Sequence, residues 1–194
     1  MKYIYVLISI LLSFTPALPV LAPVGLGNNT KYNFSSHTVS LRGIDLIKRY
    51  EGLRLKSYKC PAGFKTIGYG HQTQSLNRIT MEQAEELLAD DLEHVEQHIN
   101  AMGMELTQNQ FDAVCSFAFN VGIYKFSQST FASTLDPEEL KKWVYANNIK
   151  LPGLIKRRNE EYNLYNNSSG SFTDWNMDRA KNNGDYFNRS ISTT

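Results

Sequence analysis

The sequence predicts an α+β domain that is mainly helical, in which a long helix joins a small β-hairpin lobe to a larger helical lobe, with a cleft between them. Three patterns predict this architecture. Two short runs rich in β-forming residues follow one another within residues 53–69. A long amphipathic helical pattern begins at Thr80, and a helical pattern that is apolar on nearly every side begins at Thr107. A cleft between two such lobes would suit an extended substrate.

Length and charge set broad limits on the class of protein. The chain has 194 residues, enough for one compact domain with tails. Its 20 basic residues nearly cancel its 19 acidic ones. Without a strong net charge, no global field favours binding to nucleic acid or to a membrane surface. The two cysteines, Cys60 and Cys115, allow one bridge at most, which excludes a disulfide scaffold.

The N-terminal segment has the pattern of an export signal. Lys2 is followed by an apolar run over residues 3–12, about the length of a secretory hydrophobic region. A transmembrane helix needs about 20 apolar residues without breaks. The uncharged stretch over residues 3–30 is interrupted early by three prolines: Pro16, Pro19 and Pro23. We predict a cleaved signal peptide over residues 1–22, a linker over 23–39, and a secreted or periplasmic protein. The alternative is an uncleaved or releasable signal anchor.

The hairpin lobe is predicted to follow the first helix directly. Ser40 can cap the start of that helix, and Gly52 lies where a glycine commonly ends one. The apolar stripe of the helix contains Leu41, Ile44 and Ile47. Residues 53–58 and 65–69 then predict two short strands, separated by a turn at Pro61-Ala-Gly63.

Two capping boxes mark the main helices of the larger lobe. Thr80-Met-Glu-Gln83 opens the long amphipathic helix, which we expect to end at Gly103. Thr107-Gln-Asn-Gln110 opens the second helix, which we expect to be buried centrally and to stop at Gly122.

The remaining helices are shorter. A short helix is expected within residues 126–135, and Asp136-Pro137 is a strong helix start. Residues 152–165 predict the last helix. We assign residues 40–172 to the folded domain and residues 173–194, rich in Asn, Ser and Asp, to a C-terminal tail.

Glu51 is the first candidate for chemistry. It closes the first predicted helix, so it faces the negative end of the helix dipole, which disfavours its charged form. If it is also partly buried, it would keep its proton at neutral pH, as a general acid must. The alternative is an ordinary exposed glutamate at a helix end.

The segment after Glu51 is basic. No Asp or Glu occurs between Gly52 and Met81, whereas five basic residues do: Arg54, Lys56, Lys59, Lys65 and Arg78. Such a segment would suit an anionic polymer, with stacking on Tyr58, Phe64 or Tyr69. A solvated strand face explains any single lysine about equally well.

The spacing Glu51-x8-Cys60-x5-Thr66, followed by Ile-Gly-Tyr-Gly-His71, resembles the phage-type lysozymes, the endolysin family of muramidases. The resemblance continues in order through residues 40–172. It includes four further segments: 79–88, 106–113, 116–122 and 153–158.

This resemblance implies cleavage of the β-1,4 bond between N-acetylmuramic acid and N-acetylglucosamine in peptidoglycan, and therefore lysis of the bacterial cell wall. It also implies that Glu51 is the general acid and that Thr66 positions the attacking water. Cys60 stands where most members have Asp. As a thiolate, which Lys59 and Lys65 would favour, it could stabilise the transition state, activate water or attack the sugar. The alternative is a polar filler without a chemical role.

Other reactive side chains have simpler interpretations. We expect Cys115 to lie in the core as a free thiol, although a bridge to Cys60 would silence the enzyme if the geometry allowed it. His71 resembles the family's structural histidine, whose carboxylate partner would be Asp91 or Asp90. His94 and His98 lack the glutamate of a zinc motif, and we expect them at the surface. We predict no metal and no cofactor.

The family position of Asn120 and of one residue of the pair Arg157/Arg158 suggests that they support the site, although capping and surface pairing are alternatives. The expected partner is the peptidoglycan glycan strand. We expect a monomer that binds no nucleic acid and, in its mature form, no membrane. Two other functions stay open: a lytic transglycosylase, which needs one glutamate and no second carboxylate, and a catalytically inactive peptidoglycan-binding protein.

Overall fold

The computed structural model describes residues 36–60 and 63–167. The predicted signal peptide (1–22) and C-terminal tail (173–194) lie outside the described residues. So do most of the predicted linker and two residues of the hairpin turn, Pro61 and Ala62.

Helix α1 spans Leu41–Glu51 and places Glu51 at its C-terminal end, as predicted. The Ser40 side chain caps its first turn, and the backbone N–H of Ser40 donates to Asp112 Oδ1 at 2.8 Å. Gly52 ends the helix with a φ of 69°, which favours glycine. Leu41, expected in the apolar stripe, is 69% exposed because it lies at the outer end of the helix.

The hairpin lobe is an antiparallel sheet in the order β1-β2-β3: β1 Arg54–Lys59, β2 Lys65–Gly68 and β3 His71–Gln72. Strands β1 and β2 are the predicted pair, and in their register Tyr58 lies opposite Thr66. The two-residue strand β3 was not predicted, because two residues are too few to show an alternating pattern. The sheet packs on α2 through a small core of Ile67, Ile79 and Ala84.

Both capping boxes are present. Helix α2 spans Met81–Ala101 and α3 spans Gln108–Val121, each with reciprocal side-chain and backbone hydrogen bonds at its first turn. Gly122 ends α3, which is buried along most of its length as predicted. The main core gathers around this helix; its largest fully buried apolar side chains include Phe111, Phe117, Phe126, Phe131 and Leu140.

Shorter elements complete the helical lobe: α4 Ile123–Ser127, α5 Thr130–Thr134, the 3-10 helix η1 Pro137–Lys142, β4 Tyr145–Ala146, β5 Ile149–Lys150 and α6 Pro152–Asn166. The strong start at Asp136 therefore opens only a six-residue 3-10 helix. The β4–β5 hairpin was not predicted. Its turn residues, Asn147 and Asn148, both have positive φ, which asparagine tolerates better than most residues.

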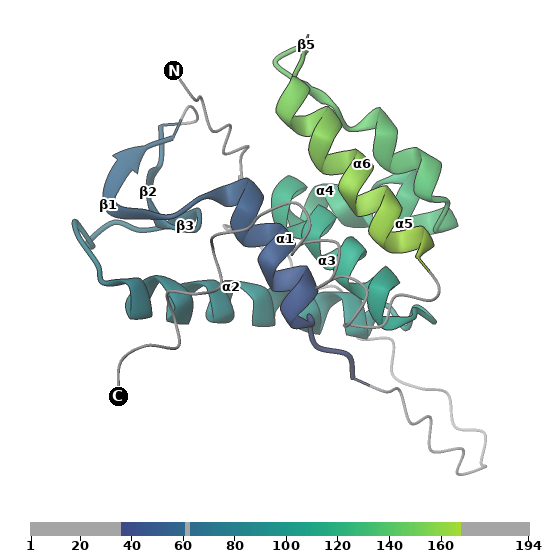
Figure 1. Ribbon diagram of the computed structural model, residues 1–194, viewed down its shortest axis with the longest axis horizontal. Helices are drawn as coiled ribbons and strands as arrows, with labels where there is room; N and C mark the ends of the chain where they lie inside the picture. The colour runs from purple at the N-terminus through teal and green to yellow at the C-terminus, as the bar shows by residue number, and fades with distance from the viewer. Residues whose placement is uncertain (1–35, 61–62, 168–194) are drawn as a thin grey trace, which may run out of the picture.

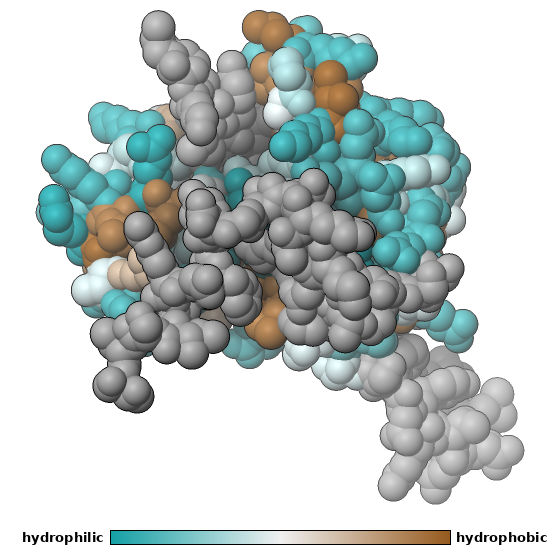
Figure 2. All heavy atoms as spheres, viewed as in Figure 1, coloured by the Kyte–Doolittle hydropathy of each residue, from teal (hydrophilic) through white to brown (hydrophobic). Residues whose placement is uncertain are grey.

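The two lobes share helix α2. In Figure 1 this helix runs beneath the strands at one end and beneath the helical lobe at the other, while the C-terminal end of α1 points to the strands. The coloured part of the face in Figure 2 is mostly hydrophilic, with hydrophobic residues in small separate patches. Among the described residues, no helix is both long and apolar enough to cross a bilayer.

Candidate active site

Glu51 lies where the two lobes meet. Its side chain is only 5% exposed, which rules out the alternative of an ordinary exposed glutamate. Its Oε1 accepts a hydrogen bond from Arg157 Nη1 of α6 at 2.6 Å. On the other side, a Cβ added to Gly70 in the hairpin lobe would lie 3.6 Å from Oε2. The carboxylate is therefore enclosed by both lobes.

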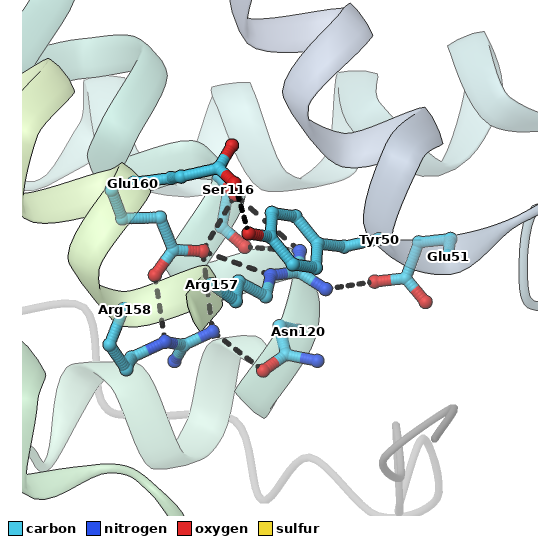
Figure 3. Close-up of polar contacts among 8 residues, drawn as sticks. Tyr50, Glu51, Ser116, Asn120, Arg157, Arg158 and Glu160 are labelled. Carbon is cyan, nitrogen blue, oxygen red and sulfur yellow. Dashed lines mark hydrogen bonds and ion pairs between the residues drawn. The ribbon is translucent and has the colours of Figure 1, made fainter. Parts of the chain in front are cut away.

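Arg157 is held on several sides at once. Its Nε donates to Glu161 Oε1 at 3.0 Å, and its Nη2 donates to the backbone carbonyl of Ser116 at 3.0 Å. Its guanidinium carbon lies 5.4 Å from the centre of the Tyr50 ring, and Figure 3 shows this ring beside the guanidinium. Burial alone would lower the pKa of Arg157, but the charges of Glu51 and Glu161 raise it overall. The side chain therefore stays cationic next to Glu51.

Glu161 is the centre of the buried network behind Arg157. It is fully buried, accepts from the Ser116 hydroxyl at 2.7 Å, and forms a second ion pair with Arg158 Nε at 2.8 Å. Burial lowers the pKa of Arg158 to about 10, with the Glu161 charge acting in the opposite direction. Arg158 Nη2 also donates to Asn120 Oδ1 at 2.8 Å. Because each charge has a partner, the network can hold one fixed arrangement inside the protein.

The structure distinguishes the two arginines. Arg157 contacts Glu51 directly, whereas Arg158 contacts Asn120 and Glu161. The burial of these side chains argues against capping and surface pairing, the alternative roles for Asn120 and the arginines.

Thr66 lies inside the hairpin lobe, in β2, and is 1% exposed. Its hydroxyl donates to the Phe64 carbonyl at 3.3 Å. Tyr58 of β1 lies opposite Thr66 in the sheet. Burial raises the pKa of Tyr58; the charge of Glu51 raises it further, whereas the charge of Arg54 lowers it.

Cys60 directly follows β1 and is 8% exposed. Its backbone N–H donates to the Phe64 carbonyl at 2.8 Å, which fixes it at the start of the hairpin turn. The Lys65 ammonium, expected to favour a thiolate, instead donates to Asn77 Oδ1 at 2.6 Å.

Cys115 is a second free thiol, separate from Cys60, so the structure does not contain the bridge considered above. It is fully buried in α3 within the main core, as predicted. Burial, and then the charges of Glu96 and Asp112, raise the pKa of its thiol.

Two side chains beside Gly70 are tied to α2. His71 Nδ1 lies 3.1 Å from both carboxylate oxygens of Asp91, which identifies Asp91 rather than Asp90 as the partner. The Tyr69 hydroxyl donates to Glu85 Oε1 at 3.0 Å, and Lys48 of α1 forms an ion pair with the same carboxylate. These contacts fix the short segment that covers Glu51.

His94 is exposed and His98 is half-buried, with its Nε2 lying 2.7 Å from Ser127 Oγ. Over residues 36–60 and 63–167, no group of three or more His, Cys, Asp or Glu residues is arranged to hold a metal ion.

Sequence reasoning missed three contributors to the site: Tyr50, Ser116 and Glu161. Glu161 follows Arg157 and Arg158 by four and three residues, a spacing that joins side chains on a helix. That spacing could have indicated the buried pairs. Nothing local indicated Tyr50 or Ser116, because their roles depend on contacts between helices.

Comparison with known proteins identifies the family of the chain. Residues 48–161 match the family model described as Phage lysozyme. An endolysin of Acyrthosiphon pisum secondary endosymbiont phage 1 is 46% identical over 142 residues, which cover 66% of this chain and 97% of that protein.

Two solved structures are also similar. The muramidase domain of SpmX from Asticaccaulis excentricus is 36% identical with a TM-score of 0.62, covering 67% of this chain and 98% of that one. A mutant of P22 lysozyme is 35% identical with a TM-score of 0.58, covering 66% of this chain and 98% of that one. The chain therefore belongs to the phage lysozyme family. It is a lysozyme, and so a glycoside hydrolase that acts on peptidoglycan.

Proposed function

We propose that the protein is an N-acetylmuramidase that cleaves the β-1,4 bond between N-acetylmuramic acid and N-acetylglucosamine, with Glu51 as the general acid. The position of Glu51 supports this best: a carboxyl group 5% exposed, at the junction of the two lobes, with one oxygen on Arg157 and the other facing Gly70. Glycosidases need a carboxylic acid to protonate the leaving oxygen.

In the proposed reaction, Glu51 donates its proton to the glycosidic oxygen as the bond from that oxygen to the sugar C1 breaks. Water then adds to C1 of the oxocarbenium-like sugar and releases a proton, which replaces the one that Glu51 donated, so that the net change is hydrolysis. Thr66 is proposed to position this water. Cys60 is proposed to replace the second carboxylate, by stabilising the developing positive charge, activating the water or attacking C1.

The products of digestion test the type of reaction. Mass spectrometry of purified cell wall treated with the protein should find reducing N-acetylmuramic acid ends. Ends in the 1,6-anhydro form would identify a lytic transglycosylase instead. Intact wall with bound protein would identify an inactive binding protein.

We propose that the protein acts outside the cytoplasm, as a monomer, on peptidoglycan glycan strands. The location outside the cytoplasm rests on the sequence pattern of residues 1–22, which predicts a cleaved signal and, as the alternative, an anchor. The proposed domain, residues 40–172, contains the segment that matches the family. N-terminal sequencing of exported protein distinguishes the two cases: a start near residue 23 supports cleavage, and a retained Met1 or Lys2 supports an anchor.

A further inference from the structure

Besides Glu161, a second carboxylate follows Arg157 closely in the sequence of α6. Glu160 follows Arg157 by three residues, a spacing at which oppositely charged side chains on a helix commonly pair. In the structure, Glu160 is engaged elsewhere. Its Oε1 accepts from the Tyr50 hydroxyl at 2.6 Å, and its Oε2 accepts from Arg49 Nη1 at 2.8 Å. Both of these donors come from α1.

Tyr50 therefore contacts both Glu160 and Arg157. Its hydroxyl engages Glu160, while its ring packs against the Arg157 guanidinium. Figure 3 shows the ring beside Arg157 and a dashed line from Arg157 to Glu51. Tyr50 immediately precedes Glu51 in α1, so the residue that holds Glu160 adjoins the proposed acid.

We propose that Tyr50 is a positioning residue that keeps Glu160 away from Arg157, so that Arg157 donates to Glu51 and sets the charge state of the acid. This inference rests on the proposed role of Glu51 as general acid. Arg49 assists by holding the second oxygen of Glu160, and is itself paired with Asp45 Oδ2 at 3.2 Å.

The charged groups around this arrangement lie on α1 and α6. Glu51 of α1 faces Arg157 of α6. After burial, the charge of Glu51 raises the pKa of Tyr58 in β1. Arg157 also contacts Glu161.

The charges of Glu160 and Glu161 raise the pKa of the Tyr50 hydroxyl, and the charge of Arg49 lowers it. Burial first, and then its hydrogen bond to Glu160, raise the pKa of Tyr50. Its hydroxyl therefore remains a donor over the pH range in which the enzyme would work.

The direction of the effect on catalysis follows from charge. A nearby cation favours the ionised carboxylate, and a general acid acts in its protonated form. If Glu160 draws Arg157 away, Glu51 keeps its proton to higher pH. The alkaline limb of the pH–activity profile should therefore move upward, by roughly 0.5–1 pH unit, a fraction of the shift of one to three units that a close opposite charge can cause.

The test compares Tyr50→Phe, which keeps the ring but removes the hydroxyl, with the double variant Tyr50→Phe/Glu160→Gln. The single variant should move the alkaline limb upward. The double variant should return it to the wild-type position, because a neutral amide does not compete for Arg157. Tyr124→Phe, at a residue 70% exposed, is the matched control and should leave the profile unchanged.

Arg49→Gln provides a second route if Tyr50→Phe does not fold. It frees the other oxygen of Glu160 at a side chain 46% exposed, and should cause a smaller shift in the same direction, again reversed by Glu160→Gln. An unchanged alkaline limb in the single variants, or a shift that Glu160→Gln does not reverse, would overturn the inference. Activity retained in Glu51→Gln would instead overturn the proposed role of Glu51, so the two failures are distinguishable.

Discussion

Arg157 Nη1 lies 2.6 Å from Glu51 Oε1, although the two residues are 106 positions apart in the sequence. The contact joins the end of α1 to α6, and both side chains are almost fully buried. The proposed acid is therefore held by the same network that fills the space between these helices. Changes to this network should affect stability and activity together.

Arg157→Gln should reduce stability. The substitution leaves Glu161 and Glu51 without their shared cation in a buried site, and removing one partner of a buried pair typically costs about 3–5 kcal/mol. Urea unfolding should show this loss in the free energy of unfolding. Lys156→Gln, an exposed neighbour on α6, should change it little. Equal stability of the two variants would mean that the network contributes nothing to the fold.

Cys60→Asp should retain activity, whereas Cys60→Ala should lose most of it. An aspartate restores the carboxylate that glycosidases usually place there, and alanine removes any group able to stabilise charge or activate water. Rates of wall clearing, at matched concentrations of folded protein, check the prediction. Full activity of Cys60→Ala would show that this position plays no chemical role.

Cys115 should make the protein less stable at alkaline pH. Its pKa is raised in the folded state, so above the ordinary thiol value of 9.0 the unfolded chain loses this proton before the folded protein does. The stability that the group contributes is present below that pH and is lost as the pH rises. The free energy of unfolding, measured in urea between about pH 8 and pH 10.5, should fall less steeply with pH for Cys115→Ala than for the wild type. If the free energy of unfolding fell equally steeply with pH in both proteins, the raised pKa of Cys115 would be contradicted.

The sequence was most informative where structure is decided locally. Ser40, Thr80 and Thr107 begin the helices that they were expected to begin, because a cap depends on residues three positions away. The glycine at position 52 ends α1 directly after Glu51 for the same reason. These local rules determine where the proposed acid lies on its helix.

The surroundings of Glu51 were less predictable, because they depend on packing between distant segments. Sequence alone did not distinguish Arg157 from Arg158, which are neighbours on one helix but point to different partners. The engagement of Glu160 by Tyr50 spans 110 positions and has no local pattern. The β4–β5 hairpin was missed because its strands are only two residues long, although Asn147-Asn148 is a recognisable turn.

The central claim, that Glu51 is the general acid, is tested most directly by wall clearing with Glu51→Gln beside Glu86→Gln, an exposed glutamate on α2. Glutamine can still accept the hydrogen bond from Arg157 but cannot donate a carboxylic acid proton. Clearing by Glu51→Gln should fall by about 10²-fold or more, while Glu86→Gln should clear at the wild-type rate. Equal clearing by Glu51→Gln and the wild type would contradict the claim.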